Sequence, residues 1–427
     1  MTVQEVIDYI HSANWMGSVP CLSRTQNLLA MMGNPEKKLK FVHIAGTNGK
    51  GSTAAMAASI LTKAGYRTGL YTSPYIYRFH ERMQIDGEQI SDEDLVEIAE
   101  FVKPLADSLE QHPREFELVC CIAFEYFARK NCDIVVLEVG MGGAFDATNV
   151  IDCPEVAVIT NIGLDHTDFL GNTLEEIAET KAGIFKEGGH AVVYRGTPGV
   201  EAVFERICAE KHMKLHKADF DSLVNTSRSL FGQTFDCGSR KNIELPLLGE
   251  HQMFNASVVL SIMDTLVEQG WNISEEHIRE GLKCVTWPGR FDIVSRDPLF
   301  IIDGGHNPQC IEALVKNIRD YLTGRRVIAL VGVLADKDYA EMFRPVMDLV
   351  EQFVCITPDS PRKLEANELA AYLRGVGAKA EGCGEMENGI RRCLELAGED
   401  GVVLCFGSLY SIGAVKDTLN TVLSGKK

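Results

Sequence analysis

The stretch FVHIAGTNGKGSTAAMAASIL, from Phe41 to Leu61, contains the features on which the fold depends. An apolar strand runs into a glycine-rich turn, and the helix that follows carries Lys50 at its start. Glycines let the backbone turn its N–H groups inward, the helix N-terminus adds partial positive charge, and the lysine adds a full one. The stretch therefore predicts a loop that holds nucleotide phosphates.

The spacing of this loop differs from the usual Walker pattern. The residue five positions before Gly49 is Ile44, and Gly51 separates Lys50 from Ser52. The usual motif has a glycine at the first of these places and a hydroxyl residue directly after the lysine. The loop is therefore not a standard Walker P-loop. Alternatively, the glycines only form a turn between a strand and a helix and bind no phosphate.

The composition limits the partners that the protein can have. With 427 residues the chain is long enough for two domains. Its net charge of −18 argues against a broad nucleic-acid or acidic-membrane surface, because such surfaces need clustered positive charge. The 13 cysteines form no CxxC pair, which favours reduced thiols over disulfides or zinc. We see neither a signal peptide nor an apolar run of roughly 18 residues, and we expect a cytoplasmic protein.

Strand-like and helix-like segments alternate after the glycine-rich loop. The expected helices are 92–109, 116–130, 173–185 and 252–269, and the expected strands are 134–139, 156–159 and 190–193. This order predicts an α/β fold with a mostly parallel sheet and helices on both faces. Residues 219–244 break the alternation, and we expect an antiparallel hairpin or flap there.

A second series of strands and helices begins near residue 297. Its expected strands are 299–303, 327–331, 353–356 and 402–406, and its helices are expected to begin near Pro308, Asp338, Leu364 and Glu385. The polar stretch 295–298 separates the two series. The sequence therefore predicts a P-loop domain over 1–296 and a smaller α/β domain over 297–427.

Polar side chains follow several of the expected strands. Glu138 ends one strand, His166 lies just beyond the next, and Ser73 follows the short strand 69–71. The carboxyl ends of parallel strands face the ligand crevice, and a carboxylate there suits the magnesium ion that bridges terminal phosphates. A capping or salt-bridged glutamate and a hydrogen-bonded structural histidine are the alternatives.

Further candidates lie on a helix and at the domain junction. Lys181 is on an otherwise acidic helix, where an ordinary salt-bridged lysine is the simplest interpretation. Arg290 in WPGRF and the DGGHN turn at 303–307 flank the junction. Because clefts between domains are favoured ligand sites, these residues can reach a ligand or can serve the junction alone.

Together these motifs resemble the folylpolyglutamate synthase and dihydrofolate synthase family of the Mur-ligase superfamily. The motifs, in chain order, are GTNGKGST, TSPYIYRFHERMQIDG, LEVGMGG with DATN, TNIGLDH with LGNT and KAGI, LLGEHQMFNA, WPGRF, DGGHN and GSLY. The resemblance implies a Mur-ligase-like fold with a Rossmann-like second domain. It also implies an ATP-dependent amide ligase, in which an acyl phosphate forms on a pteroate-type carboxylate and the amino group of L-glutamate displaces the phosphate.

The resemblance implies roles for individual residues as well. ATP would be held by Asn48, Gly49, Lys50, Gly51, Ser52, Thr53, Asn255, Arg290 and Asp303. Magnesium would be bound by Ser73, Glu138 and His166, and Lys181 would be carbamylated. Lys50, Lys181, Asp303 and His306 would be catalytic, and the glutamate side of the cleft would include His306 and Ser408. The folate side would include Arg82, Phe116, Glu117 and Asp146.

Several positions depart from the family pattern. Gly305 stands where alanine is usual, Ala144 where arginine is common, and Tyr75 where histidine is common. FELVCC at 116–121 also differs from the more usual FELxTA. Apart from the small change at Gly305, these differences lie on the pterin side, so contacts to that substrate are expected to differ from those of the family.

Two other functions are compatible with a phosphate loop. A Mur-type ligase would add an amino acid to a cell-wall nucleotide, but the GKGST, DATN and DGGHN motifs argue against it. A P-loop phosphotransferase or regulatory NTPase would make no amide and would not need cleft residues from the second domain. For the ligase, dihydropteroate and tetrahydrofolate are both candidate acceptors, and the family usually consists of monomers.

Overall fold

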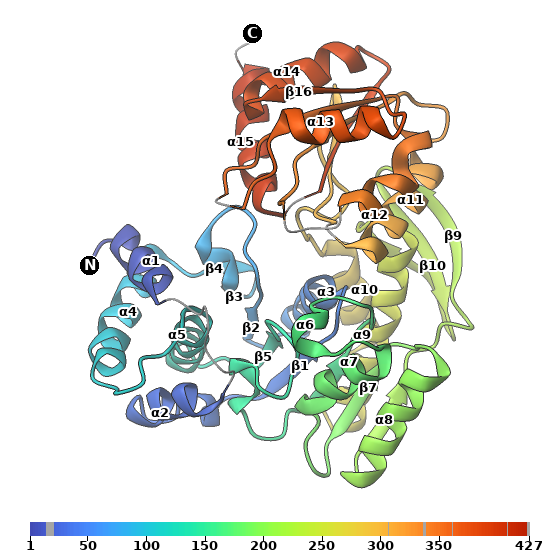
Figure 1. Cartoon of the computed structure of the whole chain (residues 1–427). Coiled ribbons are helices and arrows are strands. Elements are labelled where there is room, and N and C mark those ends of the chain that lie inside the picture. The colour runs from blue at the N-terminus through green and yellow to red at the C-terminus, as the bar shows by residue number, and fades with distance from the viewer. Residues whose placement is uncertain (14–20, 306, 336–338, 361, 408, 425–427) are drawn as a thin grey trace.

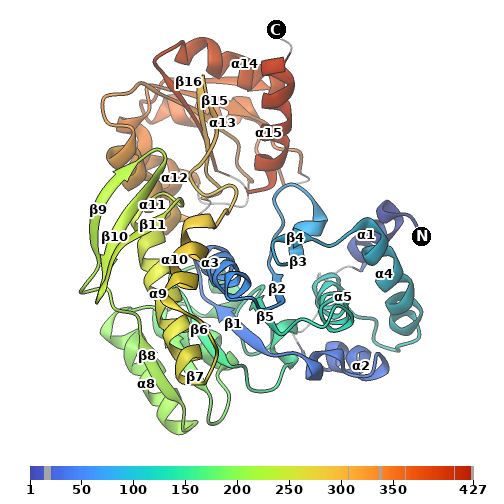
Figure 2. The same cartoon turned by 180° about the vertical axis from the view of Figure 1, so that it is seen from behind.

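The computed structural model describes residues 1–13, 21–305, 307–335, 339–360, 362–407 and 409–424. Two α/β parts and a small antiparallel sheet make up the molecule (Figures 1 and 2). The predicted class, a large P-loop sheet followed by a smaller Rossmann-like sheet, is confirmed. In the described part of the chain, no helix combines the length and the apolar character needed to span a membrane.

The larger sheet has eight strands in the order β4-β3-β2-β5-β1-β6-β7-β8. Its strands are β1 (Phe41–Ala45), β2 (Thr68–Tyr71), β3 (Met83–Ile85), β4 (Glu88–Gln89), β5 (Ile134–Glu138), β6 (Val156–Ile159), β7 (His190–Val193) and β8 (Lys214–Lys217). All neighbours from β2 to β8 pair in parallel, whereas β3 and β4 form an antiparallel edge. Because β1 is the central strand, the loop that follows it lies at the middle of the carboxyl edge.

Helices cover both faces of this sheet. One face is covered by α3 (Lys50–Lys63), α9 (Glu250–Glu268) and α10 (Glu275–Cys284). The other is covered by α5 (Glu115–Arg129), α7 (Leu174–Lys181) and α8 (Pro198–Glu210), with α1 (Val3–Ser12), α2 (Ser23–Met31) and α4 (Asp92–Asp107) packed around α5. Burial on both faces explains why β1, β5 and β6 are continuous apolar runs without alternation. The short α6 (Thr167–Leu170) follows β6.

The second sheet has six strands in the order β12-β13-β17-β14-β15-β16. These are β12 (Asp292–Arg296), β13 (Leu299–Ile302), β14 (Val327–Val331), β15 (Gln352–Ile356), β16 (Ala380–Gly384) and β17 (Val402–Phe406). One face packs against α11 (Pro308–Tyr321), α12 (Tyr339–Phe343) and α13 (Ala366–Gly375), and the other against α14 (Met386–Ala397) and α15 (Leu409–Ser424). The predicted division at 296/297 falls in the turn between the antiparallel strands β12 and β13. The division itself stays a prediction.

The antiparallel element predicted over 219–244 is a three-stranded sheet. It consists of β9 (Val224–Ser229), β10 (Gly232–Cys237) and β11 (Arg240–Leu245). Phe235 and Leu245 pack into the core beside α9, while Arg228 forms an ion pair with Asp320 of α11. Figure 1 shows this sheet running alongside both α/β parts. It therefore braces the second part against the first.

Helix α10 packs unusually close to α3, the helix that begins at the phosphate loop. A Cβ on Gly281 would lie 2.5 Å from Ile60 Cα and 2.8 Å from Ile60 N, and Ser59 Oγ donates to Gly281 O at 2.7 Å. Since both neighbouring atoms belong to the backbone, a methyl group at this position must push the two helices apart.

We therefore expect Gly281→Ala to destabilise the protein by about 1–3 kcal/mol, as overpacking of a core usually does. Gly375→Ala is the matched control, because it is also a helical glycine but a Cβ there meets nothing within 4 Å. That control should be neutral or stabilising by up to about 1 kcal/mol. Urea denaturation measures both, and equal free energies of unfolding for the two variants would contradict the packing argument.

Candidate active site

The glycine-rich loop lies between β1 and α3. Gly46 and Gly49 have φ angles of +149° and +85°, which side chains disfavour. A Cβ on Gly46 would lie 1.8 Å from Thr160 Oγ1, and one on Gly49 would lie 2.5 Å from Asn255 Oδ1. Neither position can carry a side chain without movement of its neighbours, so both the turn and the close packing require glycine.

Two lysine amino groups meet at the carbonyl of Gly46. Lys50 Nζ donates to Gly46 O at 3.1 Å and to Thr47 O at 3.2 Å, and Lys181 Nζ reaches Gly46 O from α7 at 2.9 Å. Lys181 is buried, and burial together with the charge of Lys50 lowers the pKa of its amino group to about 7. The acidic chain therefore gathers two lysine amino groups at the glycine-rich loop.

Glu138 ends β5 and points to the same edge. Its side chain is buried, and burial raises the pKa of the carboxyl group to about 7, against the opposing charge of Lys50. Its Oε2 accepts a hydrogen bond from the backbone N–H of Ser73 at 3.1 Å. Two of the three predicted magnesium ligands are thus in contact.

His166, the third predicted ligand, is the N-cap residue directly before α6, has a φ of +51° and lines the same cleft. Among the described residues, no three His, Cys, Asp or Glu side chains come close enough to hold a metal ion by themselves. Magnesium does not require such a cluster, because it commonly uses one or two carboxylates together with substrate phosphates and water. The donor set at Glu138 and Ser73 fits that pattern.

The second part of the molecule closes over the loop through the start of α11. Asn48 Nδ2 donates to Gln309 Oε1 at 2.9 Å, and Asn48 Oδ1 accepts from Asn307 Nδ2 at 2.9 Å. Asn307 Nδ2 also contacts Asp165 Oδ2 at 3.2 Å, and its own Oδ1 caps α11. Residues far apart in the chain are thereby brought to the two sides of one cleft.

Asp303 and Arg290 lie on the same side of the cleft. Asp303 follows β13, and its carboxylate accepts from Phe291 N at 2.9 Å and from Gly305 N at 2.7 Å. Burial raises the pKa of Asp303, and the charge of Arg290 opposes that shift. The predicted residues His306 and Ser408 lie outside the described residues.

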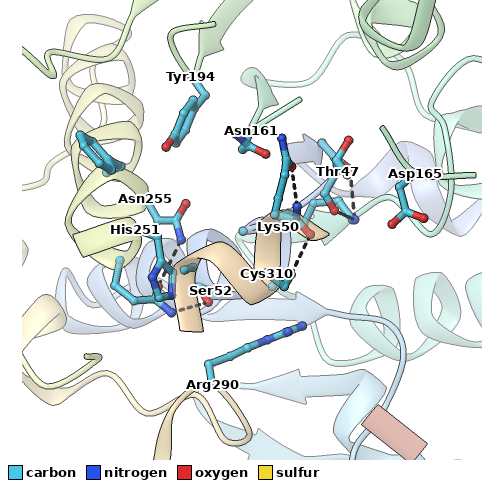
Figure 3. A pocket seen from close by; sticks show the side chains of 18 of the residues that line it. Thr47, Lys50, Ser52, Asn161, Asp165, Tyr194, His251, Asn255, Arg290 and Cys310 are labelled. Atoms are coloured by element: carbon cyan, nitrogen blue, oxygen red, sulfur yellow. Dashed lines mark hydrogen bonds between the residues drawn. The ribbon is translucent and has the colours of Figure 1, made fainter. Parts of the chain in front are cut away.

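The start of α9 forms a polar wall of the cleft. Gln252 Nε2 donates to Ser52 Oγ at 3.3 Å, and Asn255 Nδ2 donates to Gln252 Oε1 at 3.2 Å. Figure 3 shows Asn255 and His251 on one side of Lys50 and Asp165 on the other. Burial, with the charge of Arg290, lowers the pKa of His251 to about 4, so its ring is neutral at physiological pH.

Aromatic side chains that the sequence analysis missed lie beyond Asn255. Tyr194 and Phe254 line the cleft, and Phe220 packs against both, with ring centroids 4.5 and 4.8 Å away. Tyr194 directly follows β7, so its place at a strand end is the same signal that identified Glu138. Phe254 is one residue before the predicted Asn255 and could be found only from the packing of α9.

The cleft has a volume of about 500 Å³. It is lined by these predicted residues: Asn48, Gly49, Lys50, Gly51, Ser52, Ser73, Glu138, His166, Lys181, Asn255, Arg290 and Asp303. Of the predicted residues that the structure describes, those that do not line it are Thr53, Arg82, Phe116, Glu117 and Asp146. Thr53 is buried one turn into α3, and the other four lie on the predicted folate side.

Both predicted folate-side carboxylates form contacts within the protein. Glu117 receives Arg24 in a paired contact, with Nη2–Oε1 at 2.7 Å and Nε–Oε2 at 2.9 Å, which joins α2 to α5. Asp146 accepts from Thr148 Oγ1 at 2.6 Å and from Met141 N at 2.9 Å, which ties down the loop after Glu138. In this structure, Glu117 and Asp146 therefore both hold segments of the fold in place.

Arg82 and Phe116 are enclosed by aromatic and glycine neighbours. The buried Arg82 guanidinium lies 5.2 Å from the ring centroid of Tyr75, and its Nε has no hydrogen-bond partner among the described residues. The Phe116 ring lies so close to Gly140 that a Cβ there would be 2.5 Å from its Cζ. Their roles toward a substrate stay predictions.

Family models match both parts of the chain. The model of the Mur ligase middle domain matches residues 44–263, and the model of the Mur ligase glutamate ligase domain matches residues 289–409. The first covers the phosphate loop, the strand ends and α9, and the second covers the six-stranded sheet. These matches place the chain among the Mur ligases.

Individual relatives show which family of Mur ligases the chain resembles. The chain is 35% identical to a dihydrofolate synthase/folylpolyglutamate synthase of Bacillus subtilis, over 97% of this chain and 99% of that protein. It also resembles the Mycobacterium tuberculosis folylpolyglutamate synthase complexed with ADP, at 30% identity with a TM-score of 0.90 and 98% of each chain covered. An FPGS–AMPPCP–folate complex matches at 33% identity with a TM-score of 0.83, over 98% of this chain and 100% of that one. The chain belongs to the folylpolyglutamate synthase and dihydrofolate synthase family.

Proposed function

We propose that this chain is an ATP-dependent ligase that joins L-glutamate to a folate through an amide bond. The observation that carries the proposal is the single cleft in which Lys50, Glu138 and Asp303 meet in a member of this family. Relatives solved with ADP, and with AMPPCP and folate, support ATP and a folate as two of the three substrates. The name of the Bacillus relative supports dihydropteroate as an alternative acceptor.

The chemistry has two steps. A carboxylate oxygen of the acceptor attacks the γ-phosphorus of ATP, the bond to the bridging oxygen breaks, and ADP leaves. The amino group of L-glutamate then attacks the acyl carbon, phosphate leaves, and the nitrogen loses a proton. The first step spreads negative charge over the transferred phosphoryl group, which Lys50 and the inward N–H groups of the loop stabilise.

The second domain protects the intermediate. An acyl phosphate hydrolyses if water reaches it, so a closed cleft favours transfer to glutamate. The contacts of Asn48 with Asn307 and Gln309 hold α11 over the loop. By family resemblance, His306 and Ser408 bind the incoming glutamate, and Arg82, Phe116, Glu117 and Asp146 serve the folate side.

Ser73, Glu138 and His166 would hold magnesium. The ion would supply positive charge that offsets the negative charge of the ATP phosphates. The contact of Ser73 N with Glu138 holds the hydroxyl-bearing loop beside the carboxylate, which supports this assignment.

Lys181 would be carbamylated. A neutral amine adds carbon dioxide and loses a proton to form a carbamate, and the pKa of about 7 leaves much of Lys181 neutral at physiological pH. The product is an anion near the proposed metal site, in place of a buried amine that is largely neutral.

We further propose that the protein acts as a cytoplasmic monomer. All 13 cysteines are free thiols, as is usual in a reducing compartment. Light scattering at assay concentration tests the monomer, and a stable dimer would contradict it.

Incorporation of radiolabelled glutamate tests the function. With ATP and either tetrahydrofolate or dihydropteroate, we expect labelled product and one ADP per amide formed. Steady-state kinetics on both acceptors identify the preferred one. Release of phosphate without incorporation of glutamate would exclude the ligase and favour an NTPase.

Glu138→Gln tests the metal site. It removes the charge but keeps the shape, so we expect kcat to fall by about 100-fold and the magnesium requirement to rise. Thermal unfolding should show an intact fold. Glu125→Gln, a buried glutamate on α5 that pairs with Arg129, is the control and should keep the normal magnesium dependence. An unchanged magnesium titration for Glu138→Gln would remove it from the metal site.

Carbon-13 NMR in labelled bicarbonate tests the carbamate. We expect one carbamate resonance in the unaltered protein and none in Lys181→Gln. Lys186→Gln is the control, because Lys186 is also partly buried with a lowered pKa but donates to Asn149 O instead. A resonance that persists in Lys181→Gln would place the carbamate elsewhere.

A further inference from the structure

Asn317 is a buried amide that the proposed mechanism does not use. It lies on the third turn of α11, is 1% exposed and lines the cleft. Within the described part of the chain, neither its Oδ1 nor its Nδ2 has a hydrogen-bond partner. Buried amides in native proteins are nearly always paired, because an unpaired donor and acceptor have lost their water without replacement. Because Asn317 also lines the cleft, a ligand bound there can supply the missing partner.

The neighbours of Asn317 locate it along the cleft. A Cβ on Gly249 would lie 2.6 Å from Asn317 Oδ1 and 2.5 Å from His251 Cε1, so the amide lies beside His251. His251 and Tyr194 lie on the side of Lys50 away from Asp165 (Figure 3). With the phosphates at the loop of Lys50, we place the base of the nucleotide on this side.

This end of the cleft suits a flat, uncharged ring. Tyr194 and Phe254 supply aromatic surface, and His251 is neutral at physiological pH. Apolar surface fits every purine equally. The few polar side chains at this end of the cleft therefore decide which base is accepted.

An amide presents one acceptor beside one donor. Adenine presents the complement, since its 6-amino group donates and the adjacent ring nitrogen accepts, and an asparagine amide pairs with both in known adenine contacts. Hypoxanthine and guanine carry a 6-oxo group, which places a second acceptor opposite the amide oxygen.

We propose that Asn317 determines the specificity for adenine, with its Oδ1 accepting from the 6-amino group and its Nδ2 donating to the adjacent ring nitrogen. The inference rests on the proposed function, because it takes the nucleotide site as given. The proposed function names residues that hold the phosphates, and Asn317 would be the residue that selects the base.

Asn317→Leu gives the sharpest test, because leucine has a similar size and removes both polar atoms. An amide kept for a ligand costs stability in the free protein, so the leucine variant should melt at a higher temperature without nucleotide. Its affinity for ATP should fall by about 10–100-fold, which is the loss expected for two unmade hydrogen bonds.

Inosine triphosphate (ITP) differs from ATP in having the 6-oxo group. Calorimetric titration should show that the unaltered protein prefers ATP over ITP by about 10-fold or more and that Asn317→Leu has nearly lost this preference. Asn317→Ala is the second variant in case leucine disturbs α11, and it should lose the preference as well. Asn388→Leu, an exposed position on α14, should match the unaltered protein in both titrations.

The outcomes separate the two levels of inference. Lower stability of Asn317→Leu with an unchanged ratio of ATP to ITP affinities would make Asn317 a structural residue and overturn the proposal. Equal binding of ATP and ITP by the unaltered protein would overturn it as well, while leaving the ligase function in place. Failure of the unaltered protein to bind any nucleotide would overturn the proposed function itself.

Discussion

The site depends on the close packing of Gly46 against Thr160, Lys50 and Lys181. The Cα of Gly46 lies against the hydroxyl of Thr160, which itself donates to Asn48 O at 2.9 Å, and its carbonyl accepts from Lys50 and Lys181. Three segments, the loop after β1, the end of β6 and α7, therefore meet at one residue without a side chain. Because Gly46 has no side chain, these segments can pack closely. The phosphate loop, the buried lysine and the strand ends therefore lie together in one small volume.

The second constraint is electrostatic. The chain carries a net charge of −18, yet it holds anionic substrates, so the cations must be concentrated where the phosphates lie. Burial moves the pKa values of Glu138 and Lys181 toward 7 from opposite sides. Groups in this state change protonation easily when a cation or an anion arrives beside them, which is the behaviour that a site for ATP chemistry requires.

The relation between the two α/β parts turns a phosphate loop into a ligase cleft. The loop alone serves kinases and NTPases equally well, and fold does not specify chemistry. Here Asn307 and Gln309 of the second part bond directly to Asn48, and Asp303 and Arg290 line the cleft on the same side. The three-stranded sheet β9–β11 braces this arrangement from outside the cleft. Asn317 of α11 is enclosed in the same cleft, beside His251.

The sequence by itself determined the elements and much of the site. Buried strands are apolar runs, strand ends carry Ser73 and Glu138, and the glycines around Lys50 mark a phosphate loop, because each of these signals is local. It did not show β12, whose half-buried residues Asp292–Arg296 lack an apolar pattern, nor Tyr194, Phe254 and Asn317. Glu117 shows the reverse case, since it was predicted on the folate side and nothing in its motif indicated that Arg24 of α2 would occupy its carboxylate. Which side chains meet across the cleft was decided only by the tertiary structure, because contacts between residues 48 and 309 or 249 and 317 depend on packing rather than on spacing along the chain.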